Sequence, residues 1–401
     1  YEDVDAQWID VNNDGFRDLV IASGGNEFYG NDAHNLPRLY LNDGKMHLEK
    51  SQGAFPPIYT TASCIVAQDI NSDGFTDLFI GSRTTPFEYG QIPSSWLLLN
   101  DGKGKFTDVT DRYAPDLKKA GMVTSAVWCD INKDGVNDLL LSTEWGGITA
   151  YVREKEKYLP RLLTDKKGWW NFVQPFDLDN DGDLDLVAGN LGLNSRLTAT
   201  PDRPVRMYYD DFDQNGRKEQ IITYYIGDRE LPFANKAELE KQLPGIKKKF
   251  LYAEDFAKAS LKELIGADQL KAATLFEADY FANTIFINDG KGNFTSSPMP
   301  AAAQFSPYRD AAMVQANDDN LPDILLVGNY YGSNIQMGRY DADGGTILIN
   351  KGQGKFEAHQ LNGLDVDGEV RHIRKVQTAK RTVWLLVRND GPAMMIGFKQ
   401  Q

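Results

Sequence analysis

Short acidic loops recur along the chain with a fixed internal spacing. "DVNNDGFRD" begins at Asp10, "DINSDGFTD" at Asp69, "DINKDGVND" at Asp130 and "DLDNDGDLD" at Asp177. The first, third, fifth and ninth positions carry carboxylate or amide oxygens, and no histidine or cysteine accompanies them. Six to eight oxygen ligands suit Ca²⁺, whereas softer metals prefer imidazole or thiolate. The pattern therefore predicts calcium sites.

Two further loops follow the same spacing less closely. "DFDQNGRKE" from Asp211 places Asn215 and Glu219 in the fifth and ninth positions. The loop from Gln315 has lost the first carboxylate and the glycine, so we expect it to be weak or empty. An ion-free turn rich in Asp, Asn and Gly is the alternative, but repulsion among like charges in five loops favours ions. We predict about five structural Ca²⁺ ions, with these ligands: Asp10, Asn12, Asp14, Asp18, Asp69, Asn71, Asp73, Asp77, Asp130, Asn132, Asp134, Asp138, Asp177, Asp179, Asp181, Asp185, Asp211, Asp213, Asn215 and Glu219.

The elements that must position these loops are short strands. An apolar run precedes and follows each loop, as in "TASCIVAQ" and "LFIGS" around the second one. Hairpins such as "WLLLNDGKGKFTDV" and "TIFINDGKGNFTSS" carry tight-turn signals. Four strands per repeating unit indicate the blades of a β-propeller. We predict a single all-β domain over residues 1–401, with blades beginning near residues 3, 61, 122, 171, 205, 310 and 370.

Two irregularities qualify this seven-bladed prediction. The fourth unit lacks a clear outer hairpin, so six blades remain the alternative. Between residues 235 and 273 the apolar spacing becomes helical, and Ser260 can cap a helix. We expect a small helical insertion within the fifth blade.

Charge and composition narrow the classes of partner. The formal net charge of −14 argues against nucleic acid and against anionic membrane surfaces. Five Ca²⁺ ions would add +10 and leave about −4. No apolar run approaches the roughly 20 residues of a membrane helix. Because the chain opens on Tyr1, we expect a trimmed product that follows a signal, a lipid anchor or further domains. The two cysteines, Cys64 and Cys129, are expected to be buried free thiols.

The repeated loop, the "IGS"- or "AGN"-like strand after it and the "NDGKG" hairpins resemble the FG-GAP or VCBS repeats of integrin α-subunit propellers. Over its whole length the chain resembles more closely the propeller portion of bacterial ASPIC/UnbV-type VCBS-repeat proteins. That closer match is carried by "GWWNFVQPFDLDNDGDLDLVAGNLGLNS", "LPGIKKKFLYAEDFAKASLKEL" and "GNYYGSNIQMGRYDADGG". The resemblance implies a secreted or cell-surface protein of the bacterial outer membrane or periplasm, and no established enzyme chemistry.

Propeller geometry indicates where a partner would bind. The loops between second and third strands open away from the acidic loops, and here they are long, unlike one another, and rich in Asn, Tyr, Arg and Trp. Aromatic and arginine side chains are frequent binding anchors, although each residue could instead satisfy loop carbonyls. The predicted partner-binding residues are Arg83, Trp145, Asn194, Tyr330, Tyr331 and Arg339, with Asn26, Glu27, Glu144 and Asn190 as further candidates.

Two classes of function fit these features. The first is a non-catalytic module that binds a glycan or a protein. The second is a polysaccharide lyase or a sugar dehydratase built on a calcium-bearing propeller. Such enzymes need a base and a charge stabiliser in one cleft, and only His34 among the four histidines falls in a loop of the candidate face. We therefore favour the binding module.

Overall fold

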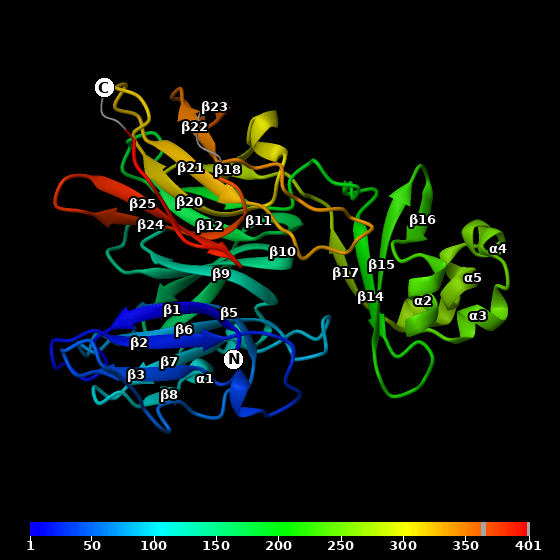
Figure 1. Cartoon of the computed structure of the whole chain (residues 1–401), viewed down its shortest axis with the longest axis horizontal. Helices are drawn as coiled ribbons and strands as arrows, with labels where there is room; N and C mark the ends of the chain where they lie inside the picture. The colour runs from blue at the N-terminus through cyan, green and yellow to red at the C-terminus, as the bar shows by residue number, and fades with distance from the viewer. Residues whose placement is uncertain (362–365, 399–401) are drawn as a thin grey trace.

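The computed structural model describes residues 1–361 and 366–398, and within them the strands form seven antiparallel sheets (Figure 1). The all-β, propeller-like prediction is confirmed. Six sheets hold strands in the order expected of blades, running from an inner strand outward. Their strands are β1 (Asp3–Ile9), β2 (Asp18–Ser23), β3 (Arg38–Asn42) and β4 (Leu48–Lys50); β5 (Thr61–Gln68), β6 (Asp77–Thr84), β7 (Trp96–Asn100) and β8 (Phe106–Asp108); β9 (Met122–Cys129), β10 (Asp138–Glu154) and β11 (Lys157–Trp169); β12 (Phe172–Phe176), β13 (Asp185–Gly189), β18 (Thr284–Asn288) and β19 (Phe294–Pro298); β20 (Tyr308–Val314), β21 (Asp323–Gly328), β22 (Thr346–Asn350) and β23 (Phe356–Gln360); and β24 (Glu369–Gln377), β25 (Thr382–Asn389) and β26 (Met394–Ile396).

The inner strands of these six sheets contact one another in chain order. β1 contacts β5, β5 contacts β9, β9 contacts β12, β12 contacts β20, and β20 contacts β24. Because β12 meets β20 directly, no blade lies between the fourth and fifth of these sheets. Of the two blade counts that the sequence left open, the packing supports six around the axis.

The seventh sheet is an insertion in the fourth blade. Its order is β16 (Arg229–Pro232), β15 (Glu219–Ile226), β14 (Val205–Asp210) and β17 (Thr274–Ala278). β13 pairs with β18 across this insertion, so the outer hairpin that the fourth unit seemed to lack is 284–298. β17 packs on β10 and β11 of the third blade, and Figure 1 shows the inserted sheet and its helices together on the right.

Most helices lie where the apolar spacing predicted them. They belong to the sheet inserted in the fourth blade, however, and not to a fifth blade. Ser260 forms a capping box with Glu263 at the start of α5. Six apolar residues of the insertion, among them Leu239 and Leu264, are buried in a core of their own. The helices are α2 (Lys236–Gln242), α3 (Gly245–Lys249), α4 (Ala253–Lys258), α5 (Leu261–Ile265) and α6 (Ala267–Ala272), with the short α1 (Thr110–Tyr113) and the 3-10 turns η1 (Ala33–Asn35), η2 (Pro115–Lys119) and η3 (Ala301–Gln304) elsewhere.

Side chains near the axis join neighbouring blades. Asp5 Oδ2 accepts a hydrogen bond from the backbone N–H of Ile65 at 3.0 Å, which links the first blade to the second. Asp310 Oδ2 accepts from Ile373 N at 3.0 Å and links the fifth blade to the sixth. Buried carboxylates need such donors, so these contacts fix the register between blades.

Cys64 and Cys129 are both free and buried, as the sequence predicted. Burial raises the pKa of each thiol to about 12, which makes them unreactive near neutral pH. Among the helices that the structure describes, none combines the length and the apolar character needed to cross a membrane.

Candidate functional site

The acidic loops share one network of hydrogen bonds from backbone to side chain. In the first loop Asp10 Oδ2 accepts from Gly15 N at 2.9 Å, and Asp14 Oδ1 accepts from Phe16 N at 2.9 Å. The second and third loops repeat both bonds. The sixth position has φ between 83° and 88° in all five loops that hold glycine there. That left-handed backbone favours glycine, which explains why the repeat retains it.

Except in the fifth loop, the ninth carboxylate ties the loop to the hairpin of its own blade. Asp185 is 1% exposed. Its Oδ2 accepts from Leu178 N at 3.0 Å, and its Oδ1 accepts from Asn288 N at 2.8 Å. Asp18, Asp77 and Asp323 make the equivalent pairs of bonds. The ninth position is therefore a structural acceptor whether or not an ion is bound.

Burial shifts the ionisation of these carboxylates. Desolvation raises the pKa of Asp77, Asp138 and Asp185 to about 6, and backbone hydrogen bonds only partly oppose that rise. The negative charges of acidic side chains in the same loop add to the increase. A cation within the loop would offset both effects.

The fourth and the fifth loop each bring three carboxylates of their own together. One carboxylate oxygen each from Asp177, Asp179 and Asp181 lie within 4.8 Å of one another, and so do oxygens of Asp211, Asp213 and Glu219. Asp177 Oδ1 is buried and has no hydrogen-bond partner among the described residues. An orphaned carboxylate oxygen in an all-oxygen donor set fits a hard divalent cation such as Ca²⁺.

The first three loops are arranged differently because their third position is asparagine. Asn12 Nδ2 donates to Asp14 Oδ2 at 2.9 Å, and Asn71 and Asn132 make the same bond to Asp73 and Asp134. This amide contact satisfies a carboxylate oxygen that the predicted ion would otherwise bind. Calcium binding by these loops stays a prediction.

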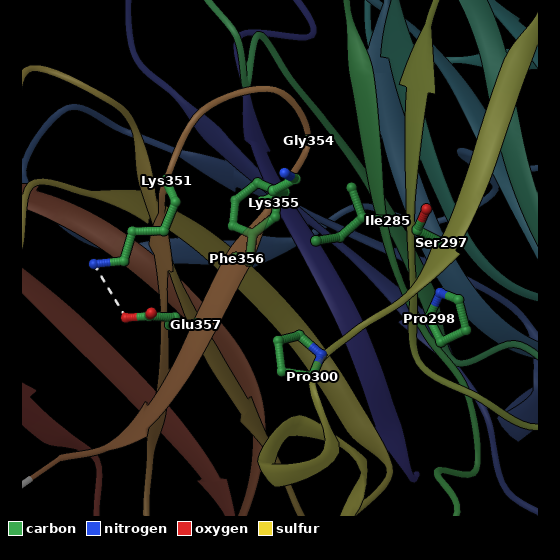
Figure 2. A pocket seen from close by; sticks show the side chains of 9 residues that line it. All are labelled: Ile285, Ser297, Pro298, Pro300, Lys351, Gly354, Lys355, Phe356 and Glu357. Atoms are coloured by element: carbon green, nitrogen blue, oxygen red, sulfur yellow. Dashed lines mark ion pairs between the residues drawn. The ribbon is translucent and has the colours of Figure 1, made fainter.

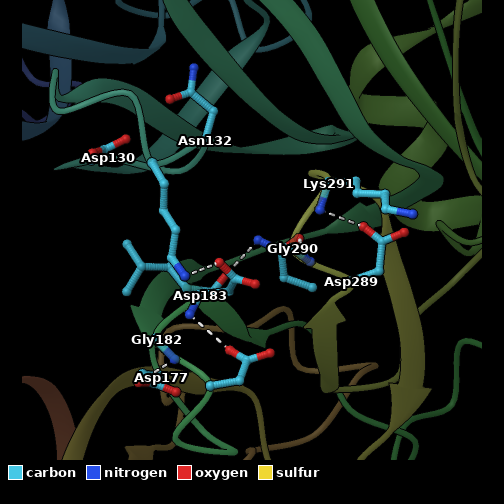
Figure 3. A network of polar contacts seen from close by, with 12 residues as sticks. Asp130, Asn132, Asp177, Gly182, Asp183, Asp289, Gly290 and Lys291 are labelled. Atoms are coloured by element: carbon cyan, nitrogen blue, oxygen red, sulfur yellow. Dashed lines mark hydrogen bonds and ion pairs between the residues drawn. The ribbon is translucent and has the colours of Figure 1, made fainter.

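A lysine joins the third loop to the fourth. Lys133 Nζ forms an ion pair with the carboxylate of Asp183. Figure 3 shows Asp183 beside Gly182 and Asp177 of the fourth loop. The hydrogen bond with Asp183, together with the charges of Asp183, Asp181 and Asp177, raises the pKa of Lys133. Lys133 therefore brings a positive charge close to the three gathered carboxylates of the fourth loop.

A groove of about 600 Å³ lies between β19 and the β22–β23 hairpin. Figure 2 shows Lys351 and Glu357 on one side of it and Ile285, Ser297 and Pro298 on the other. Lys351 Nζ and Glu357 Oε2 pair with each other at 3.1 Å. Since Lys351 and Glu357 already pair with each other, this groove does not resemble a reaction centre.

The predicted partner-binding residues do not form one continuous surface. Trp145 is only 6% exposed and packs against Trp169 in the core between the third blade and the inserted sheet. Its indole N–H donates to the Tyr89 hydroxyl at 2.7 Å. Trp145 is therefore a packing residue. Asn190 is likewise fully buried and bonded to the backbone.

Other predicted residues do remain accessible. Arg339 is exposed, and its guanidinium carbon lies 3.6 Å from the centroid of the Tyr331 ring. Asn194 is exposed and donates to Phe305 O at 3.2 Å. Asn26 and Glu27 are also exposed. Arg339 and Tyr331 thus form a stacked pair that a partner can reach.

Arg83 and Glu144 meet from neighbouring blades. Arg83 Nε lies 2.9 Å from Glu144 Oε2. Burial alone would raise the pKa of Glu144, but the charge of Arg83, with hydrogen bonds from Arg83 and Tyr89, holds it below its usual value. Arg83 lies near the end of β6, and Glu144 pairs with Met122 at the start of β9, so both lie away from the acidic loops of their blades.

Two arginines that sequence reasoning missed lie beside this pair. Arg309 and Arg371 each occupy an early position in an inner strand, in "YRD" and "VRH". Both guanidinium carbons lie over the Tyr330 ring, at 4.9 Å and 5.9 Å from its centroid. The matching position of the two arginines in adjacent blades was the signal that could have identified them.

Comparisons with known proteins agree with this geometry at the level of the repeat. A sequence model described as an FG-GAP-like repeat matches residues 10–80 and 69–141, which hold the first three acidic loops. No curated protein matches the chain. A solved structure of BBS1N in complex with ARL6DN is 9% identical with a TM-score of 0.36, covering 98% of this chain and 92% of that one. The V. cholerae biofilm matrix protein Bap1 is 11% identical with a TM-score of 0.29, covering 97% and 85%.

These matches show which features the chain shares with known proteins. The FG-GAP-like repeat is confirmed in the first part of the chain. The two structural similarities are too distant to indicate an activity or a partner. The closer resemblance to ASPIC/UnbV-type proteins stays a prediction.

Proposed function

We propose that this chain is an exported, calcium-stabilised propeller that binds a glycan or a protein without catalysis. The proposal is supported chiefly by the contrast between the two ends of the blades. Near-identical acidic turns occupy one end, whereas arginine and tyrosine side chains from different blades gather at the other. A specific partner needs an asymmetric surface, and arginine and tyrosine are common anchors in such surfaces.

Calcium fits the proposed setting. Oxygen-only sites of moderate affinity are occupied where Ca²⁺ is plentiful, outside the cytosol. We therefore place the protein on the bacterial cell surface or in the periplasm. Fractionation of native cells tests this location, and recovery in the cytosolic fraction would contradict it.

The binding surface is tested by screening the folded chain against glycan arrays and surface proteins. Arg339→Ala and Tyr331→Ala should each weaken partner binding, because the two side chains stack and are accessible. Lys103→Glu in a hairpin at the acidic end is the control, and it should leave binding unchanged. The calcium-dependent melting curve reports whether each variant is folded. If Lys103→Glu weakens binding and the Arg339 and Tyr331 changes do not, the site lies at the acidic end. Release of unsaturated sugars during the screen would instead identify a lyase.

A further inference from the structure

Three arginine side chains converge around Tyr330, at the end of the propeller opposite the acidic loops. Arg309 comes from β20, Arg371 from β24 and Arg83 from β6. The positive charges of Arg371 and Arg83 both act on Arg309, and the phenol of Tyr330 interacts with Arg83 and Arg309. Three blades thus contribute one guanidinium each to a single cluster.

The charges in this arginine cluster do not cancel. Arg83 pairs with Glu144, and Arg371 pairs with Glu369. Arg309 has no carboxylate partner within the part of the chain that the structure describes, and its Nη1 donates to the amide oxygen of Asn171 at 2.8 Å. Its Nε is buried without any hydrogen-bond partner in that same part. The cluster therefore carries one unpaired positive charge.

The surroundings of the partly buried Arg309 disfavour its positive charge. Burial, followed by the positive charges of Arg371 and Arg83, lowers the pKa of Arg309 to about 9. A buried charge normally has a counter-charge and satisfied donors. The side chains of Arg83 and Arg371 are 43% and 36% exposed, so the cluster can be reached from solvent.

We propose, building on the function inferred above, that the arginine cluster binds an oxyanion group of the ligand, with Arg309 as its main contact. A carboxylate, a sulfate ester or a phosphate ester presents two oxygens to the planar fork of a guanidinium. The partner is therefore an acidic glycan or an acidic segment of a protein, distinguished by its anionic group.

The test uses the full chain and simple anions. Sodium sulfate, phosphate and acetate are titrated by calorimetry at constant ionic strength set with chloride. At least one should bind to the unaltered protein, and Arg309→Gln should weaken that binding by at least about tenfold. The matched control is Arg196→Gln. Arg196 also lies over a tyrosine, with its guanidinium carbon 5.3 Å from the Tyr224 ring centroid, but belongs to the region of the insertion. That change should alter binding by less than about twofold.

Comparison of the three anions, and then of glucuronate with glucose, identifies the preferred oxyanion. If Arg309→Gln fails to fold, the double change Arg371→Gln with Glu369→Gln removes an ion pair as a neutral unit and should also weaken anion binding, though by less, because one of the guanidinium groups beside Arg309 is lost. Equal anion binding by the unaltered chain and these variants overturns the assignment. Anion binding that depends on Arg309 supports it even if no glycan or protein partner is found, an outcome that would count only against the function proposed above.

Discussion

The two ends of the propeller use charge in opposite ways. At the acidic end the same bonds recur from blade to blade, and Asp18, Asp77, Asp185 and Asp323 each accept two backbone N–H groups. At the other end Arg83, Glu144 and Arg309 form contacts that no other blade repeats within residues 1–361 and 366–398. The difference shows that the repeated sequence builds the scaffold, whereas single side chains at matching blade positions create an asymmetric surface on it.

The loops at the acidic end differ in how their side-chain oxygens are arranged. The fourth and fifth loops gather three carboxylates, whereas an asparagine amide contacts the fifth-position carboxylate in the first three loops. The sixth loop keeps the ninth-position bonds of Asp323 although its first carboxylate is absent. The turn can therefore form without a complete ligand set, so ion binding and turn formation can be tested separately.

Removal of calcium should have the largest effect. Two sites at a hundredfold excess of Ca²⁺ over their dissociation constants would together contribute about 5 kcal/mol to the free energy of unfolding. Differential scanning calorimetry in calcium and in EGTA measures this. Asp181→Asn should lose about half of the calcium-induced shift, whereas Asp319→Asn in the sixth loop should lose none. An identical melting temperature in EGTA would refute calcium stabilisation.

Loss of a ninth carboxylate should destabilise the blade even without calcium. Asp185→Ala leaves the backbone N–H groups of Leu178 and Asn288 unpaired in a buried site, which costs roughly 2–4 kcal/mol. Urea unfolding in EGTA measures the loss. Asp319→Ala is the exposed control, for which we expect a change below about 1 kcal/mol. Equal losses for the two variants would show that the ninth position has no special structural role.

A carboxylate at the arginine end should give a pH dependence of its own. Burial raises the pKa of Asp343 from 3.8 to about 6, despite hydrogen bonds from Thr346 and Gly345. The folded chain then binds more protons than the unfolded chain in this range, so stability falls as the pH rises from about 4 through 6. Asp343→Asn should reduce this fall by on the order of 2 kcal/mol. Urea unfolding at pH 4 and pH 7 in EGTA measures the difference, and parallel pH profiles would contradict it.

The smallest effect is expected at the contact between the third and fourth loops. Lys133→Gln removes the ion pair with Asp183, and because the lysine is half exposed we expect little change in stability. Because it also removes a positive charge near the fourth-loop carboxylates, calcium should bind there more tightly, by about two- to threefold. Calorimetric titration with Ca²⁺ tests this. Lys103→Gln, which lies in a hairpin, is the control, and a weaker affinity in Lys133→Gln would reverse the interpretation.

The sequence predicted the repeated parts of the molecule well. Spacing identified the acidic loops, the strands on either side of them and the helical segment, because each is a local pattern. It wrongly assigned the sheet at 205–278 to a fifth blade rather than to an insertion in the fourth, since a pairing such as Leu186 with Phe286 joins residues that are distant in the chain. Trp145 was expected at the surface because its loop is polar, yet the inserted sheet covers it. The arginine cluster depends on three blades meeting, and in the sequence only the matching positions of Arg309 and Arg371 in adjacent blades pointed to it.

The insertion in the fourth blade also bears on how the chain can fold. Val205 and Ala278 are paired neighbours, so the inserted segment leaves and returns at nearly the same place. If the insertion folds first, around its own core, the ends that β13 and β18 must bring together are separated by a short effective loop. Loop-closure entropy grows only slowly with length, and a prefolded insertion reduces it further. The fourth blade can then close almost as readily during synthesis as an uninterrupted one, which explains how a propeller accommodates a second folding unit within a single blade.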